Sequence, residues 1–225
     1  MEILLDSVHV EKIQKAIKIY NIAGVTTNPS LLARGGGGFF SCLGAIQECI
    51  GQRQLHIQVT ARGEEEMVQE SRRILEVFGM ETYIKIPANE TGIRVMKILK
   101  RAGVRVTATA VYTPQQAFLA ASVGADYVAP YYNRMANNNL DPGKCIREIH
   151  SLFQNMIRPP KILGAGFCST RQVVDALLAG AQAVTLAPEL LTMMTEGPLI
   201  QNALDRFASD WAACFGEKRI FELEE

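Results

Sequence analysis

A repeating order of elements constrains the fold of this chain more than any other feature. An amphipathic helix ends at a glycine, and a short apolar strand follows. The order recurs at Val77-Phe78-Gly79, Arg101-Ala102-Gly103, Ser122-Val123-Gly124 and Leu178-Ala179-Gly180, and in a looser form at Ile22-Ala23-Gly24 and Ile50-Gly51. Glycine adopts the left-handed conformation that closes a helix, so each of these glycines is predicted to mark a helix end.

Helix starts agree with this order, because Thr113-Pro114-Gln115-Gln116 and Ser169-Thr170-Arg171-Gln172 have the pattern of capping boxes. Strands are predicted at 2–6, 22–27, 54–60, 82–87, 104–111, 126–131, 161–166 and 182–187. Eight strands that alternate with helices, without a linker, favour a closed (β/α)8 TIM barrel over an open doubly wound sheet. Residues 1–225 are therefore predicted to form a single barrel domain. An extra helix and tail over about 198–225 would pack on their own barrel or on a neighbouring subunit.

Composition excludes several classes of partner. Lys+Arg and Asp+Glu both total 23, so no global charge attracts nucleic acid or an anionic membrane. The N-terminus does not have the pattern of a signal peptide, and no apolar run approaches the roughly 18 residues of a membrane span. Five cysteines without a CxxC pair and three scattered histidines show no zinc spacing. A soluble cytoplasmic protein with free thiols and no metal is predicted. The run Gly35–Gly38 matches no phosphate-binding fingerprint and is predicted to be a flexible loop.

One strand, Thr82-Tyr83-Ile84-Lys85-Ile86-Pro87, carries a lysine in its middle. A buried parallel strand normally consists of Val, Ile and Leu, and a lysine there is destabilising unless something compensates. Burial lowers the pKa of an amine, and an uncharged amine is a nucleophile towards carbonyl groups. The alternative is an edge strand or a strand end, with the Lys85 ammonium in water.

Other polar residues are predicted to gather around Lys85. Side chains along a strand alternate between its two faces, so position parity sorts inward from outward residues. Parity and strand ends place six polar residues at the mouth of the barrel: Asp6, Thr26, Asn28, Gln58, Thr109 and Tyr131. Catalytic groups of barrel enzymes lie at the carboxyl ends of the strands. Taken singly, Asp6 can be a helix cap, Asn28 a turn residue and Tyr131 a wall aromatic. His56 is interpreted as a core histidine below the rim.

This set of residues permits carbonyl chemistry. A neutral Lys85 amine attacks a ketone and loses water to give an iminium, which lets the adjacent carbon–carbon bond break or form. Tyr131, Thr109 and Gln58 can position a proton shuttle. Asp6 and Asn28 can bind substrate hydroxyls, and Asp6 can also assist proton movement. Arg134 follows the sixth strand and can hold an anionic group such as a phosphate. The chemistry requires no metal or cofactor.

Several motifs together resemble the transaldolase family, and most closely its small-subunit branch, the fructose-6-phosphate aldolases. They are Asp6, Gly24-Val25-Thr26-Thr27-Asn28-Pro29-Ser30, Ile84-Lys85-Ile86-Pro87, Thr109-Ala110-Val111-Tyr112 and Tyr127-Val128-Ala129-Pro130-Tyr131. The resemblance covers nearly the whole chain. It implies a (β/α)8 barrel with Lys85 as the Schiff-base residue and Arg134 at the phosphate end. It further implies a site formed by Asp6, Thr26, Asn28, Gln58, Thr109 and Tyr131. A homo-oligomer, either a pentamer or a decamer, is also implied, with the C-terminal helix reaching a neighbour.

Two activities of the family compete. Aldolases release dihydroxyacetone and glyceraldehyde 3-phosphate from fructose 6-phosphate, whereas transaldolases pass the dihydroxyacetone unit to an aldose phosphate. The glutamine Gln58 stands where transaldolases usually carry glutamate, and this favours the aldolase. An isomerase is disfavoured, because no suitable glutamate base or glycine-rich phosphate loop is evident. A hypothesis of another class is a non-catalytic barrel that binds sugar phosphates, although it leaves the polar ring around Lys85 unexplained.

One segment, Ala165-Gly166-Phe167-Cys168-Ser169, departs from the family pattern. The family usually has a serine at the position of Gly166, among the substrate-binding residues, and the aldolases often have a lysine at the position of Cys168. A hydroxyl and a cation are thus missing from the expected phosphate end. Another sugar phosphate, or an unphosphorylated hydroxyaldehyde, is therefore an alternative substrate.

Overall fold

The structure is a computed structural model that describes residues 1–223. The chain forms two compact units, the first spanning Met1–Pro188 and the second beginning at Glu189. The assignment of both units to one domain over residues 1–225 stays a prediction.

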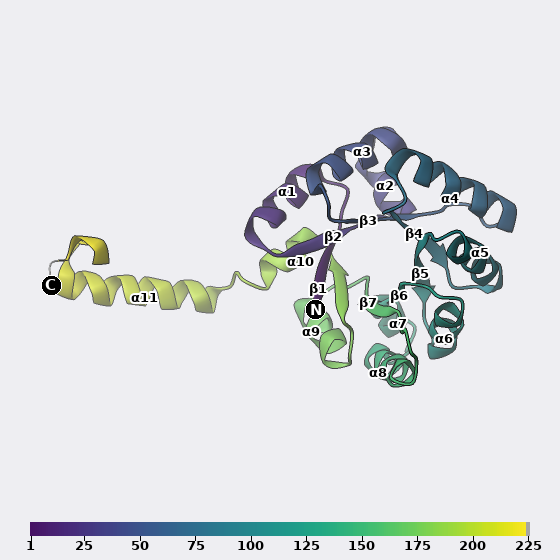
Figure 1. The fold of residues 1–225 in the computed structure, drawn as a ribbon. Helices are drawn as coiled ribbons and strands as arrows, with labels where there is room; N and C mark the ends of the chain where they lie inside the picture. The colour runs from purple at the N-terminus through teal and green to yellow at the C-terminus, as the bar shows by residue number, and fades with distance from the viewer. Residues whose placement is uncertain (224–225) are drawn as a thin grey trace. The chain divides into compact units, whose positions relative to one another are not determined.

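The first unit is a closed barrel of eight parallel strands in sequence order, in which β8 pairs with β1 (Figure 1). The strands are β1 (Glu2–Asp6), β2 (Ile22–Thr26), β3 (Gln54–Gln58), β4 (Tyr83–Pro87), β5 (Arg105–Val111), β6 (Tyr127–Pro130), β7 (Lys161–Gly164) and β8 (Ala183–Leu186). The closed sheet confirms the predicted (β/α)8 TIM barrel.

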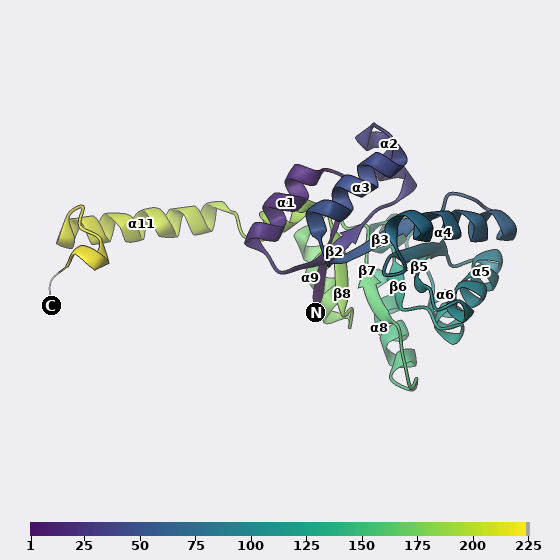
Figure 2. The same ribbon diagram turned by 45° about the horizontal axis from the view of Figure 1, so that its top comes forward.

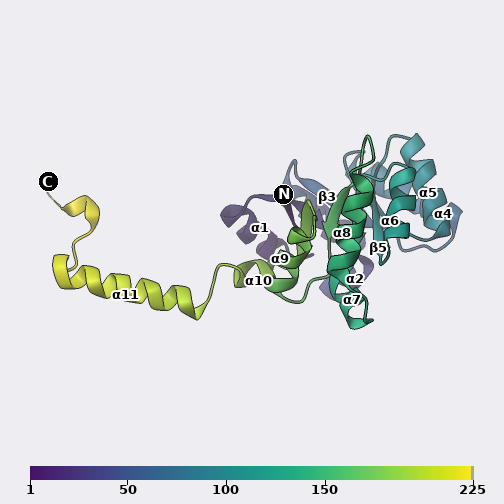
Figure 3. The same ribbon diagram turned by 90° about the horizontal axis from the view of Figure 1, so that it is seen from below.

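Helices surround the strands (Figures 1 and 2). Those of the first unit are α1 (Val10–Ile19), α2 (Pro29–Gly35), α3 (Phe39–Ile50), α4 (Glu64–Phe78), α5 (Glu90–Arg101), α6 (Pro114–Ser122), α7 (Tyr132–Asn137), α8 (Pro142–Phe153) and α9 (Thr170–Leu178). The sequence pattern did not indicate the short helices α2 and α7. Both lie at the end of the barrel opposite the N-terminus, where the strands have their carboxyl ends (Figure 3).

Most of the glycines that were predicted to end a helix do so. One of the two looser predictions is wrong. Gly51 and Gly79 stand at the C-caps of α3 and α4, as predicted. Gly24 instead lies inside β2. A Cβ at Gly24 would come within 2.3 Å of the carbonyl oxygen of Gln54, so glycine is needed there for the close approach of β3.

The predicted strand 2–6 is exact, whereas the other predicted strands extend one or two residues beyond the observed ones. Polar residues just past β2 and β3 bond to the helices that follow. Asn28 accepts from the amide of Leu31 and caps α2, and Thr60 bonds to Glu70 of α4. Tyr131 lies just before α7. The capping box of Thr113 is confirmed, but that of Ser169 is only half formed. There Ser169 accepts from the amide of Gln172, whose side chain accepts from Cys168 instead. The glycine run is also divided: Gly35 ends α2 and Gly38 caps α3.

Inward side chains fill the barrel in layers drawn from alternate strands, as is usual for this fold. The pairing register gives three layers that matter for the site. Leu4, His56, Thr107 and Leu163 form the lowest, Thr26, Lys85, Ala129 and Thr185 the next, and Asp6, Gln58, Thr109 and Ala165 the one at the mouth. Ile57, Ile84 and Ile86 have the opposite parity and are fully buried. His56 is fully buried as well, which confirms its interpretation as a core histidine.

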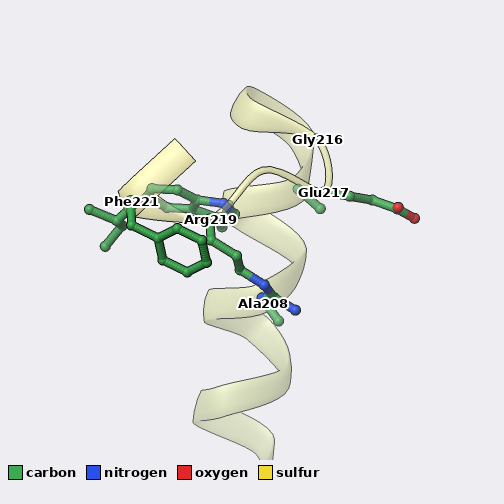
Figure 4. A pocket seen from close by; sticks show the side chains of 8 residues that line it. Ala208, Gly216, Glu217, Arg219 and Phe221 are labelled. Atoms are coloured by element: carbon green, nitrogen blue, oxygen red, sulfur yellow. The ribbon is translucent and has the colours of Figure 1, made fainter. Parts of the chain in front are cut away.

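The second unit contains α11 (Pro198–Phe215) and the short 3-10 helix η1 (Ile220–Glu222). The extra helix predicted to begin at about residue 198 is thereby confirmed; α10 (Pro188–Met193) precedes it. The Trp211 and Phe215 rings are tilted against each other with their centroids 4.5 Å apart, and the Trp211 indole donates to the carbonyl of Lys218 at 2.8 Å. A pocket of about 760 Å³ lies between α11 and η1, with Ala208, Glu217 and Arg219 among its lining residues (Figure 4). No helix among residues 1–223 is long and apolar enough to cross a membrane.

Candidate active site

Lys85 lies inside the barrel, on a strand that is paired on both sides. Its side chain is 5% exposed, and the Nζ atom donates a hydrogen bond of 2.7 Å to the backbone carbonyl of Thr27. Burial lowers the pKa of the Lys85 amine, while the Asp6 carboxylate acts in the opposite direction. The alternative of a solvated lysine on an edge strand is therefore wrong.

Asp6 is held at the end of β1 by the neighbouring strand. The hydroxyl of Thr26 donates to Asp6 Oδ1 at 2.8 Å and lies 2.7 Å from the hydroxyl of Thr185 on β8. Because Thr26 has one hydroxyl hydrogen, it accepts from Thr185 when it donates to Asp6. His9 is the N-cap of α1, so the helix-cap alternative for Asp6 does not hold. Sequence reasoning missed Thr185, although a threonine within Ala183–Leu186 is the one polar residue in that apolar strand.

A hydrogen bond joins β5 to the end of β6 at the mouth. The hydroxyls of Thr109 and Tyr131 lie 2.8 Å apart. The register of β5 shifts between Ala108 and Val111, and Ala110 adopts a φ of 55° at this bulge. A bulge redirects the side chains beside it, and here it lies next to Thr109. Burial raises the pKa of Tyr131, so its phenol stays protonated at neutral pH and can donate a proton.

Gln58 pairs with Lys85 in register and faces the same interior. Its Oε1 atom is buried and has no hydrogen-bond partner among the described residues. A buried acceptor that the protein itself does not occupy is available to a hydroxyl bound beside it. Gln58 can therefore accept a hydrogen bond from a water or hydroxyl held beside the amine.

Asn28, Arg134 and Gly166 lie at the rim. Asn28 uses its Oδ1 to cap α2, which supports the structural alternative for that atom, and its NH2 group can still donate to a ligand. The Arg134 guanidinium lies 5.2 Å from the centre of the Tyr131 ring, and its Nη1 is 3.5 Å from the hydroxyl of Tyr112. Sequence reasoning missed the contact with Tyr112, which no spacing rule indicates.

The structure brings Gly166 beside the helix that carries Arg134. The amide of Asn133 donates to the carbonyl of Gly166 at 3.2 Å. Gly166 is exposed, its φ is 69°, and a Cβ there would meet no atom within 4 Å. The rim thus carries the cation of Arg134, and the open position Gly166 is bonded to the residue that precedes this arginine.

The arrangement supplies a nucleophilic amine, a proton donor, an acceptor without a partner and a carboxylate within one barrel mouth. These groups suit the addition of an amine to a ketone and the movement of protons around the adduct. Among residues 1–223, no group of three or more His, Cys, Asp or Glu side chains is placed to hold a metal ion.

Comparison with known proteins gives a consistent result. The family model described as "Transaldolase/Fructose-6-phosphate aldolase" matches residues 3–222. A relative from Streptococcus pneumoniae, named "Probable fructose-6-phosphate aldolase", is 39% identical over 213 residues, which cover 94% of this chain and 96% of the relative. The chain therefore belongs to the transaldolase/fructose-6-phosphate aldolase family.

Proposed function

We propose that this protein is a metal-independent Schiff-base aldolase with Lys85 as its nucleophile. It cleaves or forms fructose 6-phosphate, or a related sugar phosphate, from dihydroxyacetone and an aldehyde such as glyceraldehyde 3-phosphate. The observation that carries the proposal is the 5% exposure of Lys85 at the mouth of a polar barrel. The relative from Streptococcus pneumoniae is named as a probable fructose-6-phosphate aldolase, which supports the same substrate.

The reaction follows from an uncharged amine. Lys85 adds to the ketone carbon, and the adduct loses water to give an iminium. The hydroxyl beyond the neighbouring carbon–carbon bond loses its proton, that bond breaks, and its electrons form an enamine while the aldehyde leaves. The enamine takes up a proton at carbon, and water then adds to the iminium to release dihydroxyacetone and the free amine. The iminium itself accepts the electrons, so the cleavage step needs no cofactor.

The polar ring serves the proton transfers and holds the substrate. Tyr131 and Thr109 hold the catalytic water or proton, supported by their 2.8 Å hydrogen bond. The partnerless Oε1 of Gln58 accepts a hydrogen from that water. Asp6 assists proton movement and, with Thr26, orders the hydroxyl end of the substrate.

The phosphate end lies at the rim. Arg134 binds the phosphate of the substrate, and the Asn28 amide binds a hydroxyl. The backbone beside Gly166 would face the same phosphate, without the hydroxyl that a serine would add.

Transaldolase activity is the second candidate, because the matching family model covers both enzymes. A glutamine amide holds water differently from a glutamate carboxylate, since it cannot take up a proton as a base. Gln58 therefore favours release of dihydroxyacetone over its transfer to an acceptor.

Two measurements test the proposal. Borohydride reduction in the presence of dihydroxyacetone should add mass to Lys85 and to no other lysine. Fructose 6-phosphate should yield free dihydroxyacetone without an added acceptor, whereas product that forms only with erythrose 4-phosphate would indicate a transaldolase. If Lys85 gains no mass and no product forms, the non-catalytic sugar-phosphate-binding barrel becomes the better hypothesis.

The protein is also proposed to be a cytoplasmic homo-oligomer, a pentamer or a decamer, that binds neither nucleic acid nor membrane. The exposed apolar side chains of α11 support assembly, because Leu199, Ile200, Leu204 and Phe207 are 50–84% exposed. The five cysteines are free in the described part of the chain, which suits a reducing compartment.

A further inference from the structure

A closed layer of side chains lies directly beneath Lys85. Its four members come from β1, β3, β5 and β7: Leu4, His56, Thr107 and Leu163. Their exposure is at most 1%. In barrels of this kind such a layer normally consists of branched apolar residues. Here two of the four members are polar, and the mechanism above uses neither of them.

His56 and Thr107 are hydrogen-bonded to each other across the interior face of β4. His56 Nδ1 and the Thr107 hydroxyl lie 2.9 Å apart, and Thr107 is the register partner of Lys85. Since His56 is on β3 and Thr107 on β5, their hydrogen bond crosses β4 between its inward side chains, Tyr83 and Lys85. The aliphatic part of Lys85 therefore stands above this bond.

The imidazole of His56 is fixed on its other sides. Nε2 lies 3.0 Å from Gln54 Oε1, and the ring stacks on Tyr83 at 4.3 Å with an interplanar angle of 7°. Burial, and secondarily the nearby Lys85, lower the pKa of His56 well below its ordinary value, so the ring is neutral. Both ring nitrogens thus have partners, and neither offers an unoccupied acceptor to an ammonium above it.

We propose that His56 and Thr107 are positioning residues for Lys85, and that their hydrogen bond closes the barrel beneath the amine and holds its side chain extended toward the mouth. The hydrogen bond from Lys85 to the carbonyl of Thr27, just after the end of β2, shows the direction in which the side chain extends. The role of the pair rests on the proposed function of Lys85 as nucleophile.

The physical reason is the sensitivity of a buried amine to any acceptor or water near it. An ammonium is stabilised by water or by a lone pair, and an amine is favoured where neither is present. Without the Thr107 hydroxyl, Nδ1 of His56 would accept from the Lys85 ammonium or would bind a water below it. The charged form would then gain stability, and less nucleophile would remain at neutral pH.

Other titratable groups face the same interior, and they set the background for a pH experiment. They are Asp6 of β1, Tyr83 of β4 itself, Tyr127 of β6 and Tyr131 after β6. Lower down, Glu2 bonds to Tyr127 and pairs with Lys161, and Arg105 lies over the Tyr83 ring. Substitutions at His56 and Thr107 leave the identity of these groups unchanged, so the variants can be compared in one pH series.

The test compares Thr107→Val, which keeps the shape and removes the hydroxyl, with Thr107→Ser, which keeps the hydroxyl. The measured quantity is the rate of borohydride-trapped adduct formation on Lys85 with subsaturating dihydroxyacetone across a pH series. In Thr107→Val we expect the midpoint to rise by about one pH unit, which makes trapping about tenfold slower below the midpoint. In Thr107→Ser we expect the midpoint of the parent protein.

A double variant, His56→Phe with Thr107→Val, replaces the pair by an apolar layer without unsatisfied atoms. We expect the midpoint of the double variant to return to that of the parent protein or to fall below it. The double variant also serves as the test if Thr107→Val does not fold. An unchanged midpoint in Thr107→Val with a lowered melting temperature would reduce the pair to a structural role and overturn the proposal. So would an equal rise in Thr107→Ser or in the double variant. Absence of any adduct in the parent protein would instead refute Lys85 as the nucleophile.

Discussion

At the scale of single residues, the proposed chemistry depends on the environment of one amine. Lys85 is enclosed by β3 and β5 on either side and by a closed layer below, and only the mouth remains open. Burial favours the neutral amine, and the carboxylate of Asp6 favours the ammonium. Burial is the larger of the two effects. The protein thus holds a destabilised group where a nucleophile is useful.

Replacing Lys85 with methionine should stabilise the fold while it abolishes adduct formation. Because the folded state lowers the pKa of Lys85, the unfolded chain binds more protons between the folded pKa and the ordinary value near 10.5. The destabilisation of the fold by Lys85 is therefore largest at pH values below the pKa that Lys85 has in the folded state. It disappears as the pH rises past the ordinary value.

Thermal unfolding of the parent protein and Lys85→Met across a pH series measures this effect. The variant should have the higher melting temperature at neutral pH, by about 2–4 °C for each kcal/mol, and the difference should shrink at alkaline pH. The conservative exchange Lys97→Met on the surface of α5 serves as a control and should show no such pH dependence. If the parent protein were more stable than Lys85→Met at neutral pH, this would contradict the inference that Lys85 is buried as a neutral amine.

Gly166 offers a second test at this scale. Gly166→Ser restores a hydroxyl at the phosphate end, and the Michaelis constant for phosphorylated aldehydes should fall by about tenfold, the value of one charge-assisted hydrogen bond. The left-handed φ of 69° should reduce stability by about 1 kcal/mol. Steady-state kinetics with a phosphorylated and an unphosphorylated aldehyde separate the effects. An equal change for both substrates, or no change, would place the phosphate elsewhere.

At the scale of elements, strand ends and short helices determine how the mouth is assembled. The bulge at Ala110 lies beside Thr109, whose hydroxyl bonds to Tyr131, and α7 begins directly after that tyrosine. α7 then carries Arg134, while its first turn bonds to the loop after β7. Parity along ideal strands could predict the inward direction of Thr109. It could not predict the bulge, because a register shift depends on pairing with another strand.

At the scale of the whole molecule, closure of the barrel explains why residues from distant segments share one interior. Thr26 of β2 bonds to Thr185 of β8, and Glu2 of β1 forms an ion pair with Lys161 of β7. These contacts require β8 to return to β1, and an open sheet would leave them far apart.

The exposed apolar side chains of α11 give a prediction at this scale. The double substitution Leu204→Glu and Phe207→Glu should reduce the assembly to a smaller species, because charges cannot be buried in an apolar interface without a partner. Analytical ultracentrifugation measures the mass against the 24.8 kDa of one chain. Ser209→Glu, on another side of the helix, is the matched control and should leave the assembly intact. A parent protein with the mass of one chain would contradict the proposed oligomer.

The sequence by itself determined the alternation of helices and strands, the position of a lysine within an apolar strand and the parity of most site residues. These are local properties: glycines end helices, hydrophobic period separates strand from helix, and side chains alternate along a strand. The tertiary structure alone decided which polar residues satisfy one another. The His56–Thr107 bond, the Thr185 contact and the partnerless Gln58 oxygen depend on register and closure, which no local pattern encodes.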